Sequence, residues 1–189
     1  ALSWTEPAPT TSLELIAEAA IPLDAAIIDV GGGASMLAGE LLLAGYADVT
    51  VADISAAALA RARSELGEAG GRVRWIETDV RRADFGRAFA LWHDRAVFHF
   101  MVSEEDRRAY LRTLGRSLAP GGHLVLATFG PEGPSECSGL PVRRYDAAAI
   151  AGLLGEEYEL VSARLHEHRT PRGAAQQFVY AHLERRGRG

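Results

Sequence analysis

The stretch IIDVGGGASML, residues 27–37, constrains the fold of this chain more than any other segment. An apolar, β-branched run ends at an acidic residue and breaks into three glycines, which predicts a strand, a tight turn and a helix over residues 34–43. The glycines let a ligand approach the backbone, and the start of the helix would face anionic atoms. A dinucleotide fingerprint needs Gly or Ala at position 36, where this chain has Met36. The turn therefore predicts a nucleotide-type site and disfavours a nicotinamide or flavin cofactor.

Composition bounds the class of protein. With 189 residues, 48% of them hydrophobic and 24% charged, the chain predicts one domain over residues 1–189, with an irregular arm at 1–10 and a tail at 184–189. A net charge of -5 provides no basic field for nucleic acid. The single Cys137 excludes an internal disulfide and a multi-cysteine metal site, so we expect no metal. No apolar run reaches membrane-spanning length and no signal peptide is evident, which predicts a cytoplasmic protein without a membrane partner.

Acidic residues end three successive predicted strands. Asp29, Asp53 and Asp79 close the apolar runs near residues 27, 49 and 75, each beside a turn or a helix start. Carboxyl ends of parallel strands meet at one edge of a sheet, which is the edge where open α/β sheets bind ligands. Asp53 follows Asp29 by 24 positions, about the separation at which a second strand presents a carboxylate to ribose hydroxyls. A helix cap is the alternative role for Asp53, but Ser55 already supplies one.

The remaining pattern alternates strands with helices. Thr11 and Ser12 predict the start of a helix, and Ser103 predicts the start of another. The last two strands are close in sequence and joined by a turn at residues 170–173, so we expect them to pair antiparallel. Residues 130–141 are rich in Gly and Pro and predict a long loop on the ligand edge. The other expected elements are helices at 11–20, 55–68, 103–118 and 146–154, and strands at 72–80, 118–129, 158–165 and 176–183. Residues 89–100 are expected to supply the fourth strand and the segment beyond it.

The motifs IIDVGGGAS, VTVADIS, WIETDV, LWHDRAVFHF and LAPGGHLVLATF together cover nearly all of the chain. This series resembles the successive motifs of class I S-adenosylmethionine-dependent methyltransferases. The resemblance implies an α/β fold with a doubly wound, Rossmann-like seven-stranded sheet in the order 3-2-1-4-5-7-6, strand 7 being antiparallel. It also implies S-adenosyl-L-methionine as cofactor and S-adenosyl-L-homocysteine as product. The stretches WHDRAVFHF and ECSGLPVRRY look like a subgroup of small bacterial enzymes.

The resemblance assigns roles to the residues at the strand ends. Gly31 and Gly33 would line the methionine half of the cofactor, and Asp53 would hold the ribose hydroxyls. Ile54 would pack on the adenine, whose amino edge would meet Asp79 and Val80. Gly32 stands where Cys is frequent in the family, and Ser35 stands where a third Gly is frequent. The expected cofactor-binding set is Asp29, Gly31, Gly32, Gly33, Asp53, Ile54, Asp79, Val80 and Asp94.

Polar residues in the loops after strands four to six are the candidates for acceptor chemistry. Methyl transfer from a sulfonium is an in-line displacement, so the protein mainly aligns the acceptor and keeps it deprotonated. Asp94 and His99 are the best candidates for a base or orienting group, and Arg143 or Arg144 for an acidic group on the substrate. The alternative is a hydrogen-bond network or an Asp94–Arg95 ion pair that only holds loops. The candidate catalytic set is Asp94, Arg95, His99, His168, Tyr145 and Arg143, with His93 and Cys137 assigned structural roles.

Two classes of function follow from these residues. The first is an enzyme that methylates a small molecule, with a soft nucleophile such as a thiol among the candidate acceptors. The second is a protein-modifying methyltransferase, or a cofactor-binding module without catalysis. The domain-sized length leaves little room for a recognition domain, which favours the small molecule. The sequence leaves the oligomeric state open between monomer and homodimer.

Overall fold

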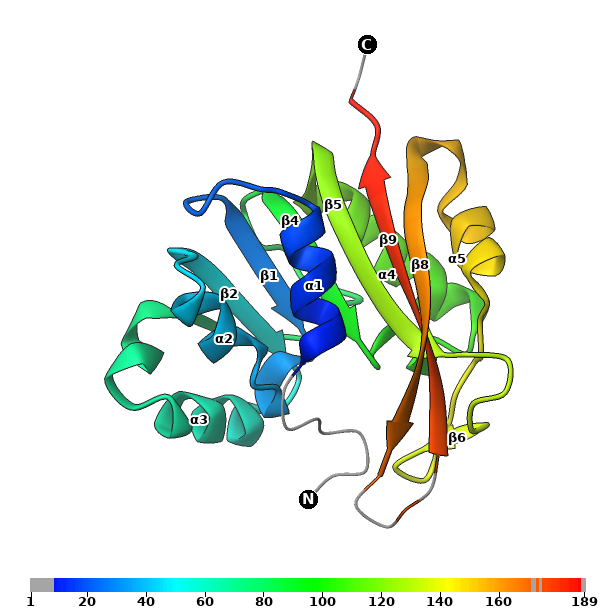
Figure 1. The fold of residues 1–189 in the computed structure, drawn as a ribbon, viewed down its shortest axis with the longest axis horizontal. Helices are drawn as coiled ribbons and strands as arrows, with labels where there is room; N and C mark the ends of the chain where they lie inside the picture. The colour runs from blue at the N-terminus through cyan, green and yellow to red at the C-terminus, as the bar shows by residue number, and fades with distance from the viewer. Residues whose placement is uncertain (1–8, 171–172, 174, 188–189) are drawn as a thin grey trace.

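The computed structural model describes residues 9–170, 173 and 175–187. Its centre is a seven-stranded sheet in the order β3-β2-β1-β4-β5-β9-β8 (Figure 1). Strand β9 is antiparallel to both of its neighbours, whereas the other neighbouring pairs are parallel. The expected order with a reversed seventh strand is therefore confirmed. The strands are β1 (Ala26–Val30), β2 (Asp48–Asp53), β3 (Arg74–Glu77), β4 (Phe89–Arg95), β5 (Leu118–Phe129), β8 (Tyr158–Arg169) and β9 (Ala175–Arg185).

Helices cover both faces of the sheet and enclose two apolar cores. Helices α1 (Thr10–Glu18), α2 (Leu37–Leu43) and α3 (Ala56–Glu65) cover one face. Helices α4 (Glu104–Ser117) and α5 (Ala147–Leu154) cover the other (Figure 1). The central strands are buried on both sides, which explains their nearly continuous apolar sequences. Short 3-10 turns occupy Gly32–Ala34, Gly67–Arg72, Phe98–Phe100 and Gly155–Glu157.

The helix starts follow local capping chemistry in three places. The side chains of Ser55, Ser103 and Asp146 each accept a hydrogen bond from a backbone N–H three residues ahead. The expected caps at Ser55 and Ser103 are thus confirmed. Thr11 and Ser12 do not cap α1, because the helix already begins at Thr10, and the cap position is Pro9. Ser12 is instead buried against the sheet.

Three segments differ from the sequence expectation. The helix expected from residue 34 is a 3-10 turn followed by α2, because Ser35 is extended and its hydroxyl accepts a hydrogen bond from the Leu37 N–H. The loop at 130–141 contains a hairpin of β6 (Glu136–Cys137) and β7 (Leu140–Pro141), turned by two residues with positive φ. Strand β9 extends into the expected tail at 184–189, since Arg185 is largely buried and pairs with Glu157. Residues 1–8 of the expected arm, and 171–172 of the expected turn, lie outside the described residues.

A buried polar chain fastens α1 to the sheet. The Oγ of Ser12 lies 2.9 Å from Nε2 of His93, and Nδ1 of His93 lies 2.7 Å from Oδ1 of Asp29. All three side chains are almost fully buried. The chain joins α1 to β4 and β1, directly below the glycine turn. His93 therefore has the structural role that the sequence assigned to it.

Replacing Ser12 with Ala should lower the free energy of unfolding by about 1–3 kcal/mol, because a buried ring nitrogen of His93 loses its partner. Urea denaturation of the two proteins measures the difference. Ser64→Ala, at an exposed position of α3, is the matched control and should have little effect. Equal stability of wild type and Ser12→Ala would show that this contact does not hold α1.

Candidate functional site

A cavity of about 690 Å³ opens at the carboxyl ends of the parallel strands. This is the edge at which open α/β sheets bind ligands. Four segments meet there: the glycine turn, the end of β2, the segment after β3 and the segment after β4, with a contribution from the β6–β7 hairpin. The lining consists of Val30, Gly31, Ala52, Asp53, Ile54, Thr78, Asp79, Val80, Arg81, Arg95, Ala96, Val97, Phe100, Met101, Val102, Ser138, Leu140 and Pro141.

The glycine turn brings backbone to the cavity wall. Gly31 has a φ of 73°, a conformation that favours glycine, and its N–H donates to the carbonyl of Ala52 over 2.7 Å. A Cβ on Gly31 would lie 2.1 Å from a methyl group of Val97. A Cβ on Gly32 would lie 2.2 Å from Oδ2 of Asp29. Both positions thus exclude a side chain, and of the three glycines Gly31 lines the cavity, whereas Gly32 and Gly33 do not.

Asp53 is fixed at the rim by two backbone groups. The N–H of Gly33 donates to Oδ2 over 3.0 Å, and the N–H of Ser55 donates to Oδ1 over 2.8 Å. Each carboxylate oxygen has a second lone pair for another donor. Ile54, next in the chain, is 69% exposed and also lines the cavity. Asp53 is therefore oriented to accept hydrogen bonds from a bound hydroxyl pair.

Asp79 forms an ion pair with Arg81, a residue that the sequence analysis did not identify. Nε and Nη2 of Arg81 donate to the two oxygens of Asp79, and Nη1 donates to Asp106 over 2.6 Å. The hydrogen bond from Arg81 lowers the pKa of Asp79 below its ordinary value. Val80 and both members of this pair line the cavity. The short spacing of Asp79 and Arg81 was a signal that could have identified the pair.

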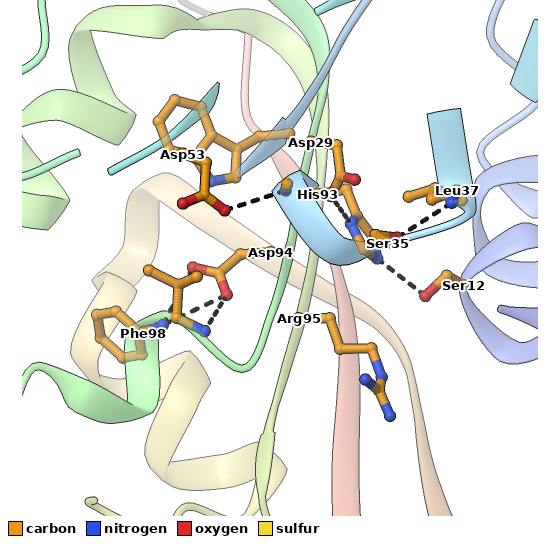
Figure 2. Close-up of polar contacts among 12 residues, drawn as sticks. Ser12, Asp29, Ser35, Leu37, Asp53, His93, Asp94, Arg95 and Phe98 are labelled. Carbon is orange, nitrogen blue, oxygen red and sulfur yellow. Dashed lines mark hydrogen bonds and ion pairs between the residues drawn. The ribbon is translucent and has the colours of Figure 1, made fainter. Parts of the chain in front are cut away.

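Asp29, which the sequence analysis placed in the cofactor-binding set, lies outside the cavity lining. Its side chain is 2% exposed and lies under the glycine turn, where Oδ1 contacts His93. Figure 2 shows this contact and the neighbouring one from His93 to Ser12. Asp29 supports the turn rather than facing the cavity.

Asp94 also lies outside the lining, because its neighbours fully enclose it. Oδ1 accepts from the N–H of Val97, Oδ2 accepts from the N–H of Phe98, and the Tyr110 hydroxyl donates to Oδ2 over 2.6 Å. Burial raises the pKa of Asp94 to about 6, although these three hydrogen bonds oppose that shift. Figure 2 shows Asp94 and Arg95 pointing apart. The sequence analysis missed Tyr110, which gives no local sign of this contact.

His99 does not line the cavity, contrary to the expectation that it faces the transferable methyl. The ring is fully buried, 4.5 Å from the ring centroid of Phe100 and 4.7 Å from that of Phe129. Neither ring nitrogen has a hydrogen-bond partner within the described part of the chain. Burial, with the charge of Arg95, lowers the pKa of His99 to about 3. An imidazole with that pKa is neutral near pH 7 and is a weak base.

The other expected catalytic residues are spread around this region. Arg95 lines the cavity and its Nε donates to the Tyr180 hydroxyl over 2.8 Å. Tyr145 and His168 are buried outside the lining, Tyr145 beside Phe98 and His168 edge-on to Phe178. Arg143 is exposed, with its guanidinium carbon 5.7 Å from the centroid of the Tyr145 ring. Arg95 is thus the member of the expected catalytic set that reaches the cavity.

Cys137 is buried in the β6–β7 hairpin, which agrees with its expected structural role. Burial raises the pKa of its thiol above the ordinary value. No group of three or more metal-ligating side chains occurs among residues 9–170, 173 and 175–187. None of the helices in the described ranges is long and apolar enough to span a membrane.

Replacing His99 with Leu should remove an acid-sensitive group. Because its pKa is lower in the folded state, wild type has the full stability of neutral His99 above about pH 6.5 and loses it as the pH falls towards 3. Chemical denaturation should therefore show His99→Leu gaining about 3 kcal/mol relative to wild type between about pH 7.5 and pH 4. A pH-independent difference would contradict the burial of a neutral imidazole.

The contribution of Asp94 to the free energy of unfolding should change with pH in the opposite direction. Its pKa is higher in the folded state, so its contribution is fully present below the ordinary pKa of 3.8 and is lost as the pH rises through about 6. The same denaturation series should show wild type losing about 2 kcal/mol relative to Asp94→Asn between about pH 4 and pH 6.5. If the two unfolding curves stay parallel over that range, Asp94 does not titrate as its enclosed position requires.

Comparison with known proteins shows which family this chain matches. A family described as a methyltransferase domain matches residues 27–122, just over half of the chain. An uncharacterised methyltransferase of Mycobacterium bovis is 33% identical over 118 residues, which cover 61% of this chain and 57% of that protein. A carboxy-S-adenosyl-L-methionine synthase of Chromohalobacter salexigens is 36% identical over 125 residues, or 61% of this chain and 44% of that protein. The chain thus spans about half the length of the curated relatives it matches.

Solved structures share the same architecture. The 1,6-didemethyltoxoflavin-N1-methyltransferase of Burkholderia thailandensis aligns with a TM-score of 0.73 at 21% identity, covering 94% of this chain and 77% of that one. At such identities the likeness concerns the fold. Together with the strand order and the family match over residues 27–122, it supports one conclusion: this chain belongs to the methyltransferase-domain family.

Proposed function

We propose that this protein transfers a methyl group from S-adenosylmethionine to a small-molecule acceptor bound in the cavity. The observation that carries the proposal is Asp53, a carboxylate held at the rim by the N–H groups of Gly33 and Ser55. It lies beside a backbone cradle at Gly31, where no side chain can fit. Membership of the methyltransferase-domain family supports the same reading.

The residues present suit this cofactor. Asp53 would accept from the two ribose hydroxyls, and Ile54 would cover one face of the adenine. Asp79 and Val80 would meet the adenine amino edge, and Gly31 would pass beside the methionine portion. The bound cofactor would supply an activated methyl group on its sulfonium. The residues of this chain would then hold the acceptor in line with the methyl group.

The apolar residues of the cavity wall would exclude water from the reaction. Val97, Phe100, Met101 and Leu140 contribute apolar side chains to it. An apolar wall lowers the local dielectric and limits competing hydrolysis. The neutral His99 behind this wall is too weak a base to deprotonate an amine or phenol near pH 7. The arrangement therefore favours an acceptor that already has its nucleophilic lone pair, such as a thiolate or a neutral nitrogen.

The volume of the cavity favours a small molecule over a protein side chain. About 690 Å³ lies within the range of clefts that bind small ligands. A related fold is described for the conversion of a disulfide into a thioacetal during echinomycin biosynthesis, with a TM-score of 0.76 at 19% identity and coverage of 96% of this chain and 83% of that one. A thiol acceptor remains our proposal. We also propose a cytoplasmic location.

Replacing Asp53 with Asn should weaken binding of S-adenosylmethionine by about tenfold to a hundredfold, because charge-assisted hydrogen bonds to the ribose are lost. Gly33 and Ser55 donate to different oxygens of Asp53, so Asn keeps one of these two hydrogen bonds and loses the other, and a thermal unfolding curve checks that the variant is folded. Isothermal titration with the cofactor measures the change. Transfer of labelled methyl to a panel of thiols, amines and phenols then tests for catalysis.

Asp24→Asn is the matched control, because Asp24 is exposed in the loop before β1. It should bind the cofactor as wild type does. Failure of the wild-type protein to bind S-adenosylmethionine would reject the proposed function. Equal affinities of wild type and Asp53→Asn would instead show that Asp53 does not bind the cofactor, without rejecting the proposed function.

A further inference from the structure

Two large apolar side chains of the cavity lining, Val102 and Leu140, are left uncovered by the rest of the protein. Val102 lies just beyond the 3-10 turn after β4 and is 44% exposed, and Leu140 begins β7 and is 57% exposed. Both side chains line the cavity. Exposed apolar surface in a concave site is typical of a place that a ligand covers. These two residues therefore identify a part of the wall that a bound molecule would bury.

A backbone hydrogen bond holds the β6–β7 hairpin beside the segment that carries Val102. The hairpin turn consists of two residues with φ values of 53° and 79°, and positive φ at both positions is typical of a tight two-residue turn. Just after β7, the N–H of Arg143 donates to the carbonyl of His99 over 2.8 Å. Leu140 thus lies on a short hairpin whose base is joined to the segment that leads to Val102.

The wall made by this hairpin and the segment after β4 is apolar apart from one hydroxyl in the lining. Phe100, Met101 and Val102 come from the segment, Leu140 and Pro141 come from the hairpin, and Ser138 supplies the hydroxyl. An apolar group placed against this wall gains from the removal of carbon surface from water. A charged group placed there would lose its hydration to carbon atoms.

The charged side chains of the lining are engaged by other parts of the protein or lie where the cofactor is proposed to bind. They are Asp53, Asp79, Arg81 and Arg95. Asp53 is the proposed ribose ligand, and Arg81 forms an ion pair with Asp79 over 2.6 Å. The Nε of Arg95 donates to the hydroxyl of Tyr180 over 2.8 Å, and its guanidinium carbon lies 4.6 Å from the centroid of the Phe178 ring. Groups of the protein itself therefore hold Arg95.

The two loop arginines that the sequence analysis assigned to an acidic group on the substrate lie outside the lining. The guanidinium carbon of Arg143 lies 5.7 Å from the centroid of the Tyr145 ring. Nη1 of Arg144 donates to the carbonyl of Pro131 over 2.9 Å. Neither position supports recognition of an acid in the cavity, so the apolar wall is the better guide to the acceptor.

We propose that the methyl acceptor is a hydrophobic small molecule with no charged group besides its reacting atom, and that Val102 and Leu140 bind its apolar part. This inference rests on the proposed function and names the substrate class of the same site. Burial of the two exposed side chains under the acceptor favours binding, whereas an ionic group on the same part of the molecule opposes it. Val102 and Leu140 therefore determine specificity and take no part in the chemical step.

The experiment uses protein saturated with S-adenosylhomocysteine and two sets of probes that share a ring system and differ in charge. The first set is benzyl alcohol, benzylammonium and benzoate, and the second is 2-naphthylmethanol, 2-naphthylmethylammonium and 2-naphthoate. Titration near pH 7 should show the alcohol of each set binding wild type about tenfold more tightly than either ion. The naphthyl alcohol should bind more tightly than benzyl alcohol, because it covers more apolar surface.

Leu140→Asn and Val102→Thr each replace apolar surface with a polar group of similar size. Each should weaken the binding of 2-naphthylmethanol by about threefold to tenfold. Leu43→Asn is the matched control, because Leu43 is 82% exposed at the end of α2 and lies outside the lining. It should bind every probe as wild type does. Binding of S-adenosylhomocysteine and a thermal unfolding curve check that each variant is folded.

The neutral preference of wild type, with weaker binding of 2-naphthylmethanol by either cavity variant, would support the inference. Tighter binding of an ion than of its alcohol, equal binding within a set, or no binding of any probe by wild type would overturn it. Unchanged affinity in both Leu140→Asn and Val102→Thr would overturn it too. If one of these variants does not fold, the other and the wild-type series decide. Failure of wild type to bind S-adenosylhomocysteine is a separate result that rejects the proposed function itself.

Discussion

The contact between Asp29 and His93 supports the rest of the ligand edge. It joins the neighbouring central strands β1 and β4 by a 2.7 Å hydrogen bond in a buried environment, and Ser12 extends it to α1. A buried carboxylate without a partner would be costly, so the two side chains hold each other in place. The glycine turn rests directly on Asp29, because a Cβ at Gly32 would collide with that carboxylate. The position of the turn therefore depends on a contact beneath the cavity.

Two carboxylates at the ends of strands, Asp53 and Asp94, have different surroundings in this fold. Asp53 accepts the backbone N–H groups of Gly33 and Ser55 and lines the cavity, where a ligand can reach it. Asp94 is enclosed by the N–H groups of Val97 and Phe98 and by the Tyr110 hydroxyl. Tyr110 in turn accepts from the Trp92 indole, which ties α4 to β4. One carboxylate is available for binding, and the other holds the segment that forms the apolar wall.

Strand β9 contributes side chains that contact the end of β4. Because β9 is antiparallel to β5, it brings Tyr180 and Phe178 beside the end of β4. The two aromatic residues orient Arg95, and His99 packs nearby against Phe129. These contacts link the end of β4 to a strand that is distant from the glycine turn in sequence.

The sequence by itself determined the alternation of strands and helices and the glycine turn, because periodicity, glycine and capping residues act locally, whereas the strand order followed from the resemblance to a known family. It also located the caps at Ser55 and Ser103. It did not determine which side chains would reach the cavity. Asp94 and Arg95 are adjacent in β4, yet alternation turns them to opposite faces of the sheet. Only tertiary packing decided that Tyr110 encloses the first while Tyr180 orients the second, since both partners come from distant parts of the chain.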